Sequence, residues 1–280
     1  MANKNQATID EILSHRYDNG FDYWATPDKK LIKGAPFTTL ECPLYLLDAG
    51  VLPGEKVMQE TANLIFETWR EDGRFKVSPK GAIYPCHTAA ALRTLCYLEH
   101  ATDKRLKKTF DYFLATQEDD GGWKCNKYSY CKGPETEFST PMTTLTVLDA
   151  FRFSEWINID ERLDQAVEFL LTHWTIKQPI GPCHHGIGTL FMQVEYPFRS
   201  YNLFYYVYVL SFYKYARKDV RFKEALHALA SQLDEGMIRV ERVVPKLRKL
   251  SFCEKGQVSD RAAERYNEIL LVMRKPFIWD

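Results

Sequence analysis

The feature that most constrains this chain is a repeated pair of helical segments. Apolar residues recur with helical periodicity, and the alternation typical of strands is scarce. Four pairs follow one another at intervals of about 48 to 58 residues, a spacing typical of helical-hairpin repeats. The pattern therefore predicts an all-α protein. The predicted pairs are 37–49 with 54–70, 86–100 with 103–116, 142–156 with 160–174, and 201–216 with 219–233.

The two helices of a pair differ in kind. The first is apolar nearly all round, as in "NLFYYVYVLSFYKY", which predicts burial on most of its faces. The second is charged and amphipathic, as in "DERLDQAVEFLLTHW". Asp103, Asp160 and Asp219 stand at the start of these second helices, where a carboxylate accepts hydrogen bonds from free N–H groups. Inner helices inside half-exposed outer helices describe a barrel within a barrel.

Long loops that contain Gly and Pro connect each second helix to the next pair, at 71–85, 118–141 and 175–199. Connections between helices usually have roughly two to eight residues, so these loops are candidates for function. The hairpin topology predicts that all three lie at one end of the barrel.

Charge and composition exclude several classes of protein. The 37 basic residues balance 37 acidic ones, so nucleic acid is not an expected partner, and the basic stretch Lys246–Lys249 is interpreted as solvated surface. No segment approaches the roughly 18 to 20 apolar residues that span a bilayer. The chain has seven cysteines and its first residues show no export signal, which predicts reduced thiols and a cytoplasmic location. No nucleotide cofactor is expected.

Residues 117–123, "QEDDGGW", end the second helix of the second pair. The stretch 108–123 resembles the Gln–Trp repeat of terpenoid cyclases: every spacing between its basic, small, aromatic, Gln, Gly and Trp positions matches. Thr109 and Phe113 depart from that repeat in residue type. Weaker copies end at Phe75 and at Ile238, and in the third pair a Trp replaces the Gln.

The matching spacing has a local physical explanation. The Gln117 side chain can bond free backbone groups at a helix end, and Trp123 can pack against it, which ties the loop to the next hairpin. These residues indicate a fold rather than a reaction. The acids between them, Asp119 and Asp120, are interpreted as solvated loop residues.

The resemblance, which covers about residues 37–238, implies the α/α toroid of terpenoid cyclases and protein prenyltransferases. We expect a single toroid domain over 1–280, with an N-terminal extension at 1–36, four hairpins at 37–234, and an irregular segment and closing helix at 235–280. Four clear hairpins are fewer than a complete ring needs, so the ring is either incomplete or closed by the irregular segment.

The family's usual reaction motifs are not evident. Cyclases that protonate their substrate resemble one another in an Asp-x-Asp-Asp motif, and the only candidate here, Asp119-Asp120, belongs to the loop already described. An Asp-rich helix that would bind a diphosphate through Mg²⁺ is not evident either. Both routes to a carbocation are therefore disfavoured, and no catalytic residue is assigned.

Cysteine and histidine clusters occur at the predicted loop end. Thiolate and imidazole are ligands that Zn²⁺ prefers. Protein prenyltransferases hold catalytic zinc with Asp, Cys and His at this end, and His87-Thr88 resembles their helix-opening His. The stretch "CHHG" loosely resembles the zinc motif of lanthionine cyclases, which share the toroid. The expected zinc ligands are Cys86, Cys125, Cys131 and Cys183, with His87 and His184 as substitutes.

The alternative is that these residues are unconnected small hydrophobes and loop histidines. No counterpart of the prenyltransferase Asp-x-Cys pair is evident, since Lys124 precedes Cys125. The remaining cysteines, Cys42, Cys96 and Cys253, are interpreted as packing residues.

The inner helices carry much of the aromatic content, which is 14% of the chain. Ring faces around an apolar cavity suit an isoprenoid chain and can stabilise a carbocation, although the same rings can simply fill a core. Polar residues among them need a reason to be buried. The candidate substrate-binding residues are Arg93, Arg152, Trp156, Phe204, Tyr205, Tyr208 and Phe212.

Three functions remain open. The first is a transferase or lyase of the prenyltransferase or cyclase type, which acts on an isoprenoid or other apolar substrate with zinc at the loop end. The second is a non-catalytic toroid that binds a lipid or a protein, with structural zinc or no metal. The third is a carbohydrate-active barrel with paired carboxylates such as Glu137 and Glu195, which the Gln–Trp repeat disfavours.

Overall fold

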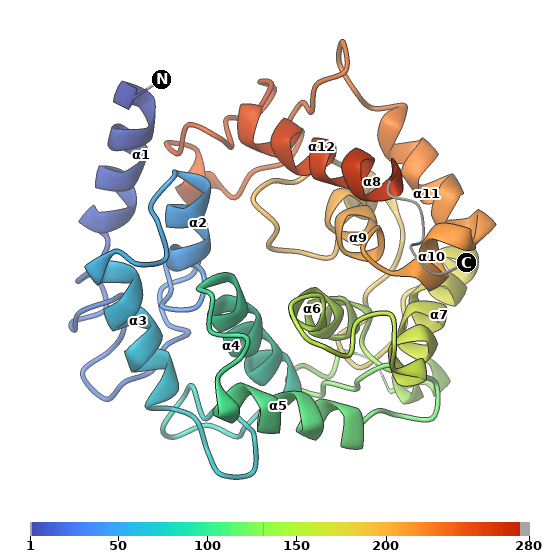
Figure 1. Ribbon diagram of the computed structural model, residues 1–280, viewed down its shortest axis with the longest axis horizontal. Helices are drawn as coiled ribbons and strands as arrows, with labels where there is room; N and C mark the ends of the chain where they lie inside the picture. The colour runs from blue at the N-terminus through green and yellow to red at the C-terminus, as the bar shows by residue number, and fades with distance from the viewer. Residues whose placement is uncertain (1, 131, 275–280) are drawn as a thin grey trace. The chain divides into compact units, whose positions relative to one another are not determined.

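A computed structural model describes residues 2–130 and 132–274 (Figure 1). Over these residues the regular structure is helical, with isolated bridges and no strands. The helices are α1 (Ala2–Ser14), α2 (Cys42–Asp48), α3 (Lys56–Phe66), α4 (Pro85–Tyr97), α5 (Lys104–Ala115), η1 (Pro134–Glu137), α6 (Pro141–Phe151), α7 (Glu161–Ile176), α8 (Thr189–Met192), α9 (Leu203–Leu210), α10 (Lys214–Lys218), α11 (Val220–Ala230), η2 (Pro245–Leu247) and α12 (Asp260–Arg274).

The chain forms two compact units. Unit 1 contains residues 1–115 and 244–253, and unit 2 contains residues 116–243 and 254–280. The expectation of a single domain over residues 1–280 stays a prediction. Among the described residues, no helix is both long enough and apolar enough to cross a membrane.

Unit 2 shows the two kinds of helix that the sequence predicts. Every residue of α9 is buried, and in α6 only Met142 is not. Their partners α7 and α11 are half exposed and lie outside them, as Figure 1 shows. Apolar residues all round α6 and α9 need neighbours on every side, whereas the amphipathic α7 and α11 bury one face.

The second helices start at an aspartate, as predicted. In each case the carboxylate accepts a hydrogen bond from the backbone N–H two residues on, at 2.7 to 3.0 Å. An arginine at that same position donates side-chain hydrogen bonds to the carboxylate, and these bonds are the main cause that lowers the pKa of each aspartate. The three pairs are Asp103 with Arg105, Asp160 with Arg162, and Asp219 with Arg221.

The fourth inner helix is shorter than predicted. The sequence indicates one helix over 201–216, but the chain leaves the helix after Leu210 and resumes at Lys214. The side chain of Asn158 explains the break: its amide donates to the Phe212 carbonyl at 3.1 Å and accepts from the Lys214 N–H at 2.5 Å. A side chain distant in sequence thus replaces hydrogen bonds that a continuous helix would make.

The predicted N-terminal extension, 1–36, contains helix α1, which is anchored within unit 1. Helix α1 packs against α2 within unit 1. The Thr8 hydroxyl donates to the Ser251 hydroxyl at 2.9 Å and accepts from the Ser251 N–H at 3.0 Å. The Trp24 indole donates to the Ile12 carbonyl at 3.2 Å. These bonds hold α1 to residues from both ends of the chain.

Candidate functional site

The turn at 117–123 fastens two hairpins together, as the sequence predicts. The Gln117 amide donates to the Gly121 carbonyl at 2.5 Å and to the Arg162 carbonyl, in the first turn of α7, at 2.7 Å. The Trp123 ring is buried and stacks on Phe151 of α6, with the ring centroids 6.4 Å apart. Gln117 therefore holds the turn to an outer helix, and Trp123 holds it to an inner one.

Asp120 corrects one interpretation of the sequence. Its carboxylate accepts hydrogen bonds from the Gly122 N–H at 3.0 Å and from the N–H and hydroxyl of Ser139 at 2.7 and 2.6 Å. The side chain is therefore a structural acceptor that joins the two ends of the loop, and of the two aspartates only Asp119 is exposed. The sequence gives no sign of this role, because Ser139 lies 19 residues away.

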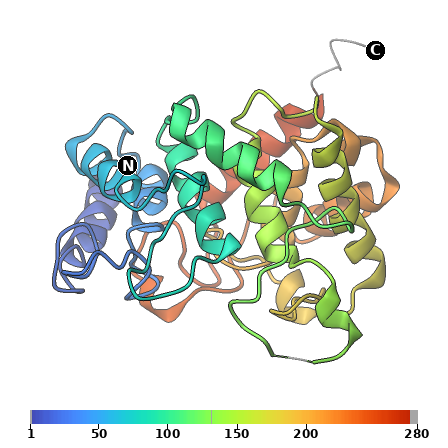
Figure 2. The same cartoon turned by 90° about the horizontal axis from the view of Figure 1, so that it is seen from below.

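Two of the long loops lie together at one end of unit 2, with η1 on one and α8 on the other (Figure 2). The Tyr130 N–H donates to the Pro182 carbonyl at 3.2 Å, and the Gly181 N–H donates to the Glu135 carbonyl at 2.9 Å. This arrangement confirms the predicted loop end for 118–141 and 175–199. The remaining loop, 71–85, belongs to unit 1.

These loops bring two of the predicted metal ligands together. Cys125 is fully buried and Cys183 is half buried. The Cys183 thiol donates to the Cys125 carbonyl at 3.3 Å. The neighbouring Cys125 side chain and burial both raise the pKa of Cys183, so this thiol is protonated at neutral pH.

Two histidines that were not predicted as ligands, His173 and His185, lie around Tyr201, with ring centroids 5.6 and 5.8 Å from the centroid of its ring. His173 of α7 is buried, with its Nδ1 2.9 Å from the Tyr201 hydroxyl and its Nε2 3.0 Å from the Gln178 carbonyl. Since a carbonyl only accepts, Nε2 carries the proton and Nδ1 accepts from the hydroxyl. Burial lowers the pKa of both His173 and His185 to about 4. The predicted substitute, His184, is exposed instead.

Two of the predicted zinc ligands, Cys125 and Cys183, are in contact. Among residues 2–130 and 132–274, no group of three or more His, Cys, Asp or Glu is placed to share a metal ion. Cys131 lies outside the described residues. Cys86 and His87 belong to unit 1, where His87 meets Tyr84 edge to face at 5.5 Å between ring centroids. Zinc binding stays a prediction.

A cluster of aromatic rings surrounds Arg152, just after the end of α6. The guanidinium carbon lies 4.1 Å from the centre of the Phe212 ring and 4.8 Å from those of Phe153 and Tyr208. The side chain is only 9% exposed, and it pairs with Asp149 at 3.7 Å. A poorly hydrated cation over several ring faces is a cation–π arrangement.

Phe198 extends this cluster from the loop before α9. Its ring centroid lies 4.9 Å from that of Phe204 and 5.0 Å from those of Tyr205 and Tyr208. Phe204, Tyr205 and Tyr208 are fully buried, whereas Phe198, Phe153 and Phe212 are half buried. The aromatic cluster, defined as these six rings with Arg152, therefore has a buried back and a partly exposed face.

The buried hydroxyls of the cluster have protein partners. Tyr205 donates to Asp149 at 2.8 Å, and Tyr208 donates to Glu268 of α12 at 2.6 Å. Burial raises the pKa of Tyr208, so its hydroxyl stays protonated. With the hydroxyls engaged, the rings present an apolar surface to any ligand.

The structure brings together five of the predicted substrate-binding residues: Arg152, Phe204, Tyr205, Tyr208 and Phe212. Trp156 is half buried and contacts Phe151 at 6.3 Å between ring centroids, outside the cluster. Arg93 is buried on α4 in unit 1. Phe198 was missed because it lies on a loop, where periodicity carries no information.

Comparison with known proteins supplies the fold. No protein-family model and no curated sequence matches the chain. A solved structure of a variant of the type II terpene cyclase MstE from Scytonema, in complex with its substrate geranylgeranyl dihydroxybenzoate, is similar in structure. The match has a TM-score of 0.50 and 14% sequence identity, and it covers 97% of this chain and 96% of that chain. The chain has the α/α-toroid fold of terpene cyclases, which confirms the predicted fold class.

Proposed function

We propose that this chain is a terpene-cyclase-like protein that binds an isoprenoid or another long apolar substrate against the aromatic cluster of unit 2. The observation that carries the proposal is Arg152, a nearly buried cation over the rings of Phe153, Tyr208 and Phe212. The shared fold supports it, because the similar cyclase holds a geranylgeranyl-bearing substrate.

Two physical properties of the cluster suit such a ligand. The half-buried rings of Phe153, Phe198 and Phe212 offer apolar surface, and each Å² that a prenyl chain covers is worth about 25 cal/mol. The hydroxyls of Tyr205 and Tyr208 are already bonded to Asp149 and Glu268, so the cluster offers ring surface rather than hydroxyl groups to a ligand. The cluster can therefore favour the binding of an apolar chain.

The proposal concerns binding first, because no proton donor is assigned. Asp149 accepts a hydrogen bond from Tyr205 and pairs with Arg152, so its carboxylate is already engaged within the protein. Formation of a cyclised isomer of the same mass would establish a cyclase, and binding without turnover would establish the non-catalytic alternative.

The test is a titration of the purified chain with geranylgeraniol, followed by tryptophan fluorescence and by native mass spectrometry. Phe198→Leu and Phe212→Leu keep an apolar side chain but remove a ring, and we expect each to weaken binding about tenfold, or about 1.4 kcal/mol. The control is Leu52→Ala, which changes a side chain 67% exposed in unit 1. No binding by the wild type, or equal binding by all variants, would reject the proposal.

Zinc stands as a separate proposal, and binding at the aromatic cluster does not depend on it. The adjacent thiols of Cys125 and Cys183 support it, but two thiols are fewer than the four ligands usual for structural zinc. Elemental analysis of the purified chain is the test. Stoichiometric zinc that is lost in Cys183→Ser would support these ligands, and zinc-free protein would reject them.

A further inference from the structure

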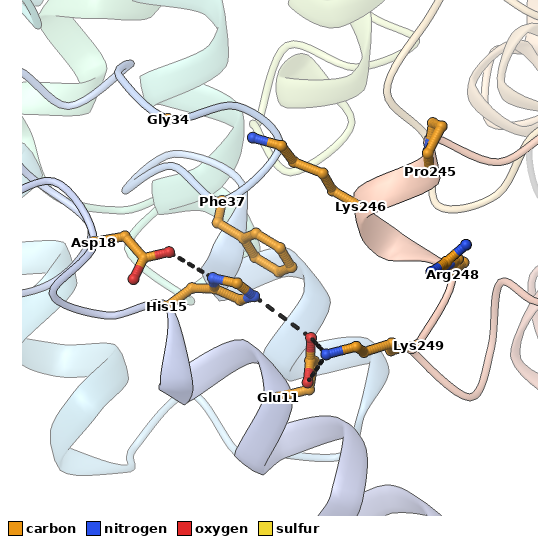
Figure 3. Close-up of a pocket in the computed structure, with 9 residues that line it drawn as sticks. All are labelled: Glu11, His15, Asp18, Gly34, Phe37, Pro245, Lys246, Arg248 and Lys249. Atoms are coloured by element: carbon orange, nitrogen blue, oxygen red, sulfur yellow. Dashed lines mark hydrogen bonds and ion pairs between the residues drawn. The ribbon is translucent and has the colours of Figure 1, made fainter.

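Unit 1 contains an open cleft of about 480 Å³ that the proposed function does not use. One wall comes from the end of α1 and the loop that follows it, and the other comes from η2 and the residues just after it (Figure 3). The lining residues are Glu11, His15, Asp18, Gly34, Phe37, Pro245, Lys246, Arg248 and Lys249.

The first wall holds a flat platform. The His15 imidazole stacks on the Phe37 ring, with the centroids 3.9 Å apart and the planes at 16°. Carboxylates fix the imidazole from both sides: Asp18 lies 2.6 Å from Nδ1, and Glu11 lies 3.5 Å from Nε2. The platform is therefore oriented before any ligand arrives.

The second wall supplies positive charge. Lys249 pairs with Glu11 at 3.1 Å, but the side chains of Lys246 and Arg248 are exposed and make no hydrogen bond or ion pair with any residue that the structure describes. In Figure 3 the Lys246 side chain extends toward Gly34 and Phe37. Since both carboxylates of the cleft already have partners, the charge left for a ligand is positive.

The two walls are held together by hydrogen bonds outside the cleft. Thr8 of α1 exchanges hydrogen bonds with the side chain and the backbone of Ser251, in the segment that carries the three cations. Thr8 is 1% exposed, so these bonds are shielded from water on the Thr8 side. The spacing between the platform and the cations is thus a property of the fold of unit 1.

We propose that this cleft is a second ligand site, which binds a small organic anion with an aromatic group. The aromatic group lies against the His15 ring, which is 28% exposed and is backed by the buried Phe37 ring, and Lys246 and Arg248 hold its oxyanion, which is either a phosphate or a carboxylate. Engaged carboxylates disfavour a cationic ligand, and the flat platform distinguishes an aryl anion from a bare inorganic one.

The test is isothermal titration of the full chain with four probes: phenyl phosphate, benzoate, inorganic phosphate and benzylamine. We expect phenyl phosphate or benzoate to bind at least tenfold more tightly than inorganic phosphate, and benzylamine not to bind. Whichever aryl anion binds better identifies the oxyanion. Equal affinity for phenyl phosphate and inorganic phosphate, or preference for benzylamine, would overturn the proposal.

Two variants separate the walls. Lys246→Gln with Arg248→Gln should weaken aryl-anion binding at least tenfold, whereas Lys255→Gln, an exposed lysine of unit 2, should leave it unchanged. Phe37→Leu should remove the preference for the aryl anion over inorganic phosphate. Both substituted cations are exposed and have no partner within 2–130 and 132–274, so their loss should not unfold the protein. Unchanged affinity in the double variant would refute the site.

Discussion

The turns at 117–123 and 232–238 derive from the same sequence pattern but differ in what they hold. Both glycines have left-handed backbone, with φ of +87° at Gly121 and +82° at Gly236. A Cβ on Gly121 would lie 2.5 Å from the Gln165 carbonyl oxygen of α7, whereas a Cβ on Gly236 would meet nothing within 4 Å. The pattern therefore encodes the turn in both places, and close contact with a neighbouring helix in only one.

The Gln and Trp positions show the same difference. Gln117 donates two hydrogen bonds, but the Oε1 atom of Gln232 is buried with no hydrogen-bond partner among the described residues. Trp123 and its counterpart Ile238 are both about 1% exposed. The weaker copy therefore keeps a buried apolar side chain at Ile238, but Gln232 does not make the hydrogen bonds that Gln117 makes to described residues. Gly73 in the remaining copy again approaches an outer helix, since its Cβ would lie 2.5 Å from the Lys108 carbonyl oxygen.

The largest effect on stability should come from Trp123, the buried side chain of the turn at 117–123. Trp123→Ala removes a buried ring that stacks on Phe151, and we expect it to lower the free energy of unfolding by about 3 to 5 kcal/mol. Urea denaturation followed by circular dichroism measures the change. A loss below about 1 kcal/mol would mean that the ring does not hold the turn.

Lowering the pH tests the stability of α7, the helix to which Gln117 is bonded, because α7 also carries His173. Its pKa is about 4 in the folded chain and about 6.5 when unfolded, so the unfolded state binds the proton first. The stability that the neutral imidazole contributes is present above about pH 6.5 and is lost as the pH falls toward 4, by about 3 kcal/mol.

Denaturation curves at pH 7, 5.5 and 4 measure this loss, with His173→Gln as the comparison. The variant cannot titrate at this position, so its unfolding free energy should fall less steeply over the same range. Parallel curves for the two proteins would contradict the assignment of the acid sensitivity to His173.

The glycines give the sharpest contrast between the two turns. Gly121→Ala adds both the strain of a left-handed alanine and a clash with the Gln165 carbonyl, so we expect a cost above about 2 kcal/mol. Gly236→Ala adds the strain alone, about 1 kcal/mol. Thermal melts of the two variants side by side make the measurement. Equal costs would show that the close approach at Gly121 relaxes freely.

The smallest effects should come from the glutamines. Gln117→Ala loses two hydrogen bonds and should cost about 1 to 2 kcal/mol. Gln232→Leu replaces a buried oxygen without a partner by an apolar group, so it should be neutral or slightly stabilising. Differential scanning calorimetry can resolve the two. Comparable losses in both variants would show that Gln232 has a polar role in solution.

Local chemistry accounts for the correct sequence predictions. Asp160 and Asp219 start their helices because a short carboxylate reaches the N–H two residues on, which depends on neighbouring residues only. Gln117 and Trp123 were placed correctly for a similar reason, since their spacing sets the turn. The aromatic residues of the inner helices likewise follow from helical periodicity.

The predictions that were wrong or incomplete depend instead on contacts between residues distant in sequence. Asp120 was interpreted as solvated because its partner Ser139 is remote, and the break in the fourth inner helix depends on Asn158. Phe198 joins the aromatic cluster from a loop that no periodic pattern places. Which loop residues meet depends on chain segments distant in sequence.

The sequence by itself determined the paired helices, their caps and their turns, because each depends on residues within a few positions of one another. Only the tertiary structure decided which turn packs closely on a neighbouring helix, which rings surround Arg152, and which cations face the His15 platform. Those groups come from segments far apart in the chain, as with Thr8 and Ser251, and their contacts exist only after the helices have packed.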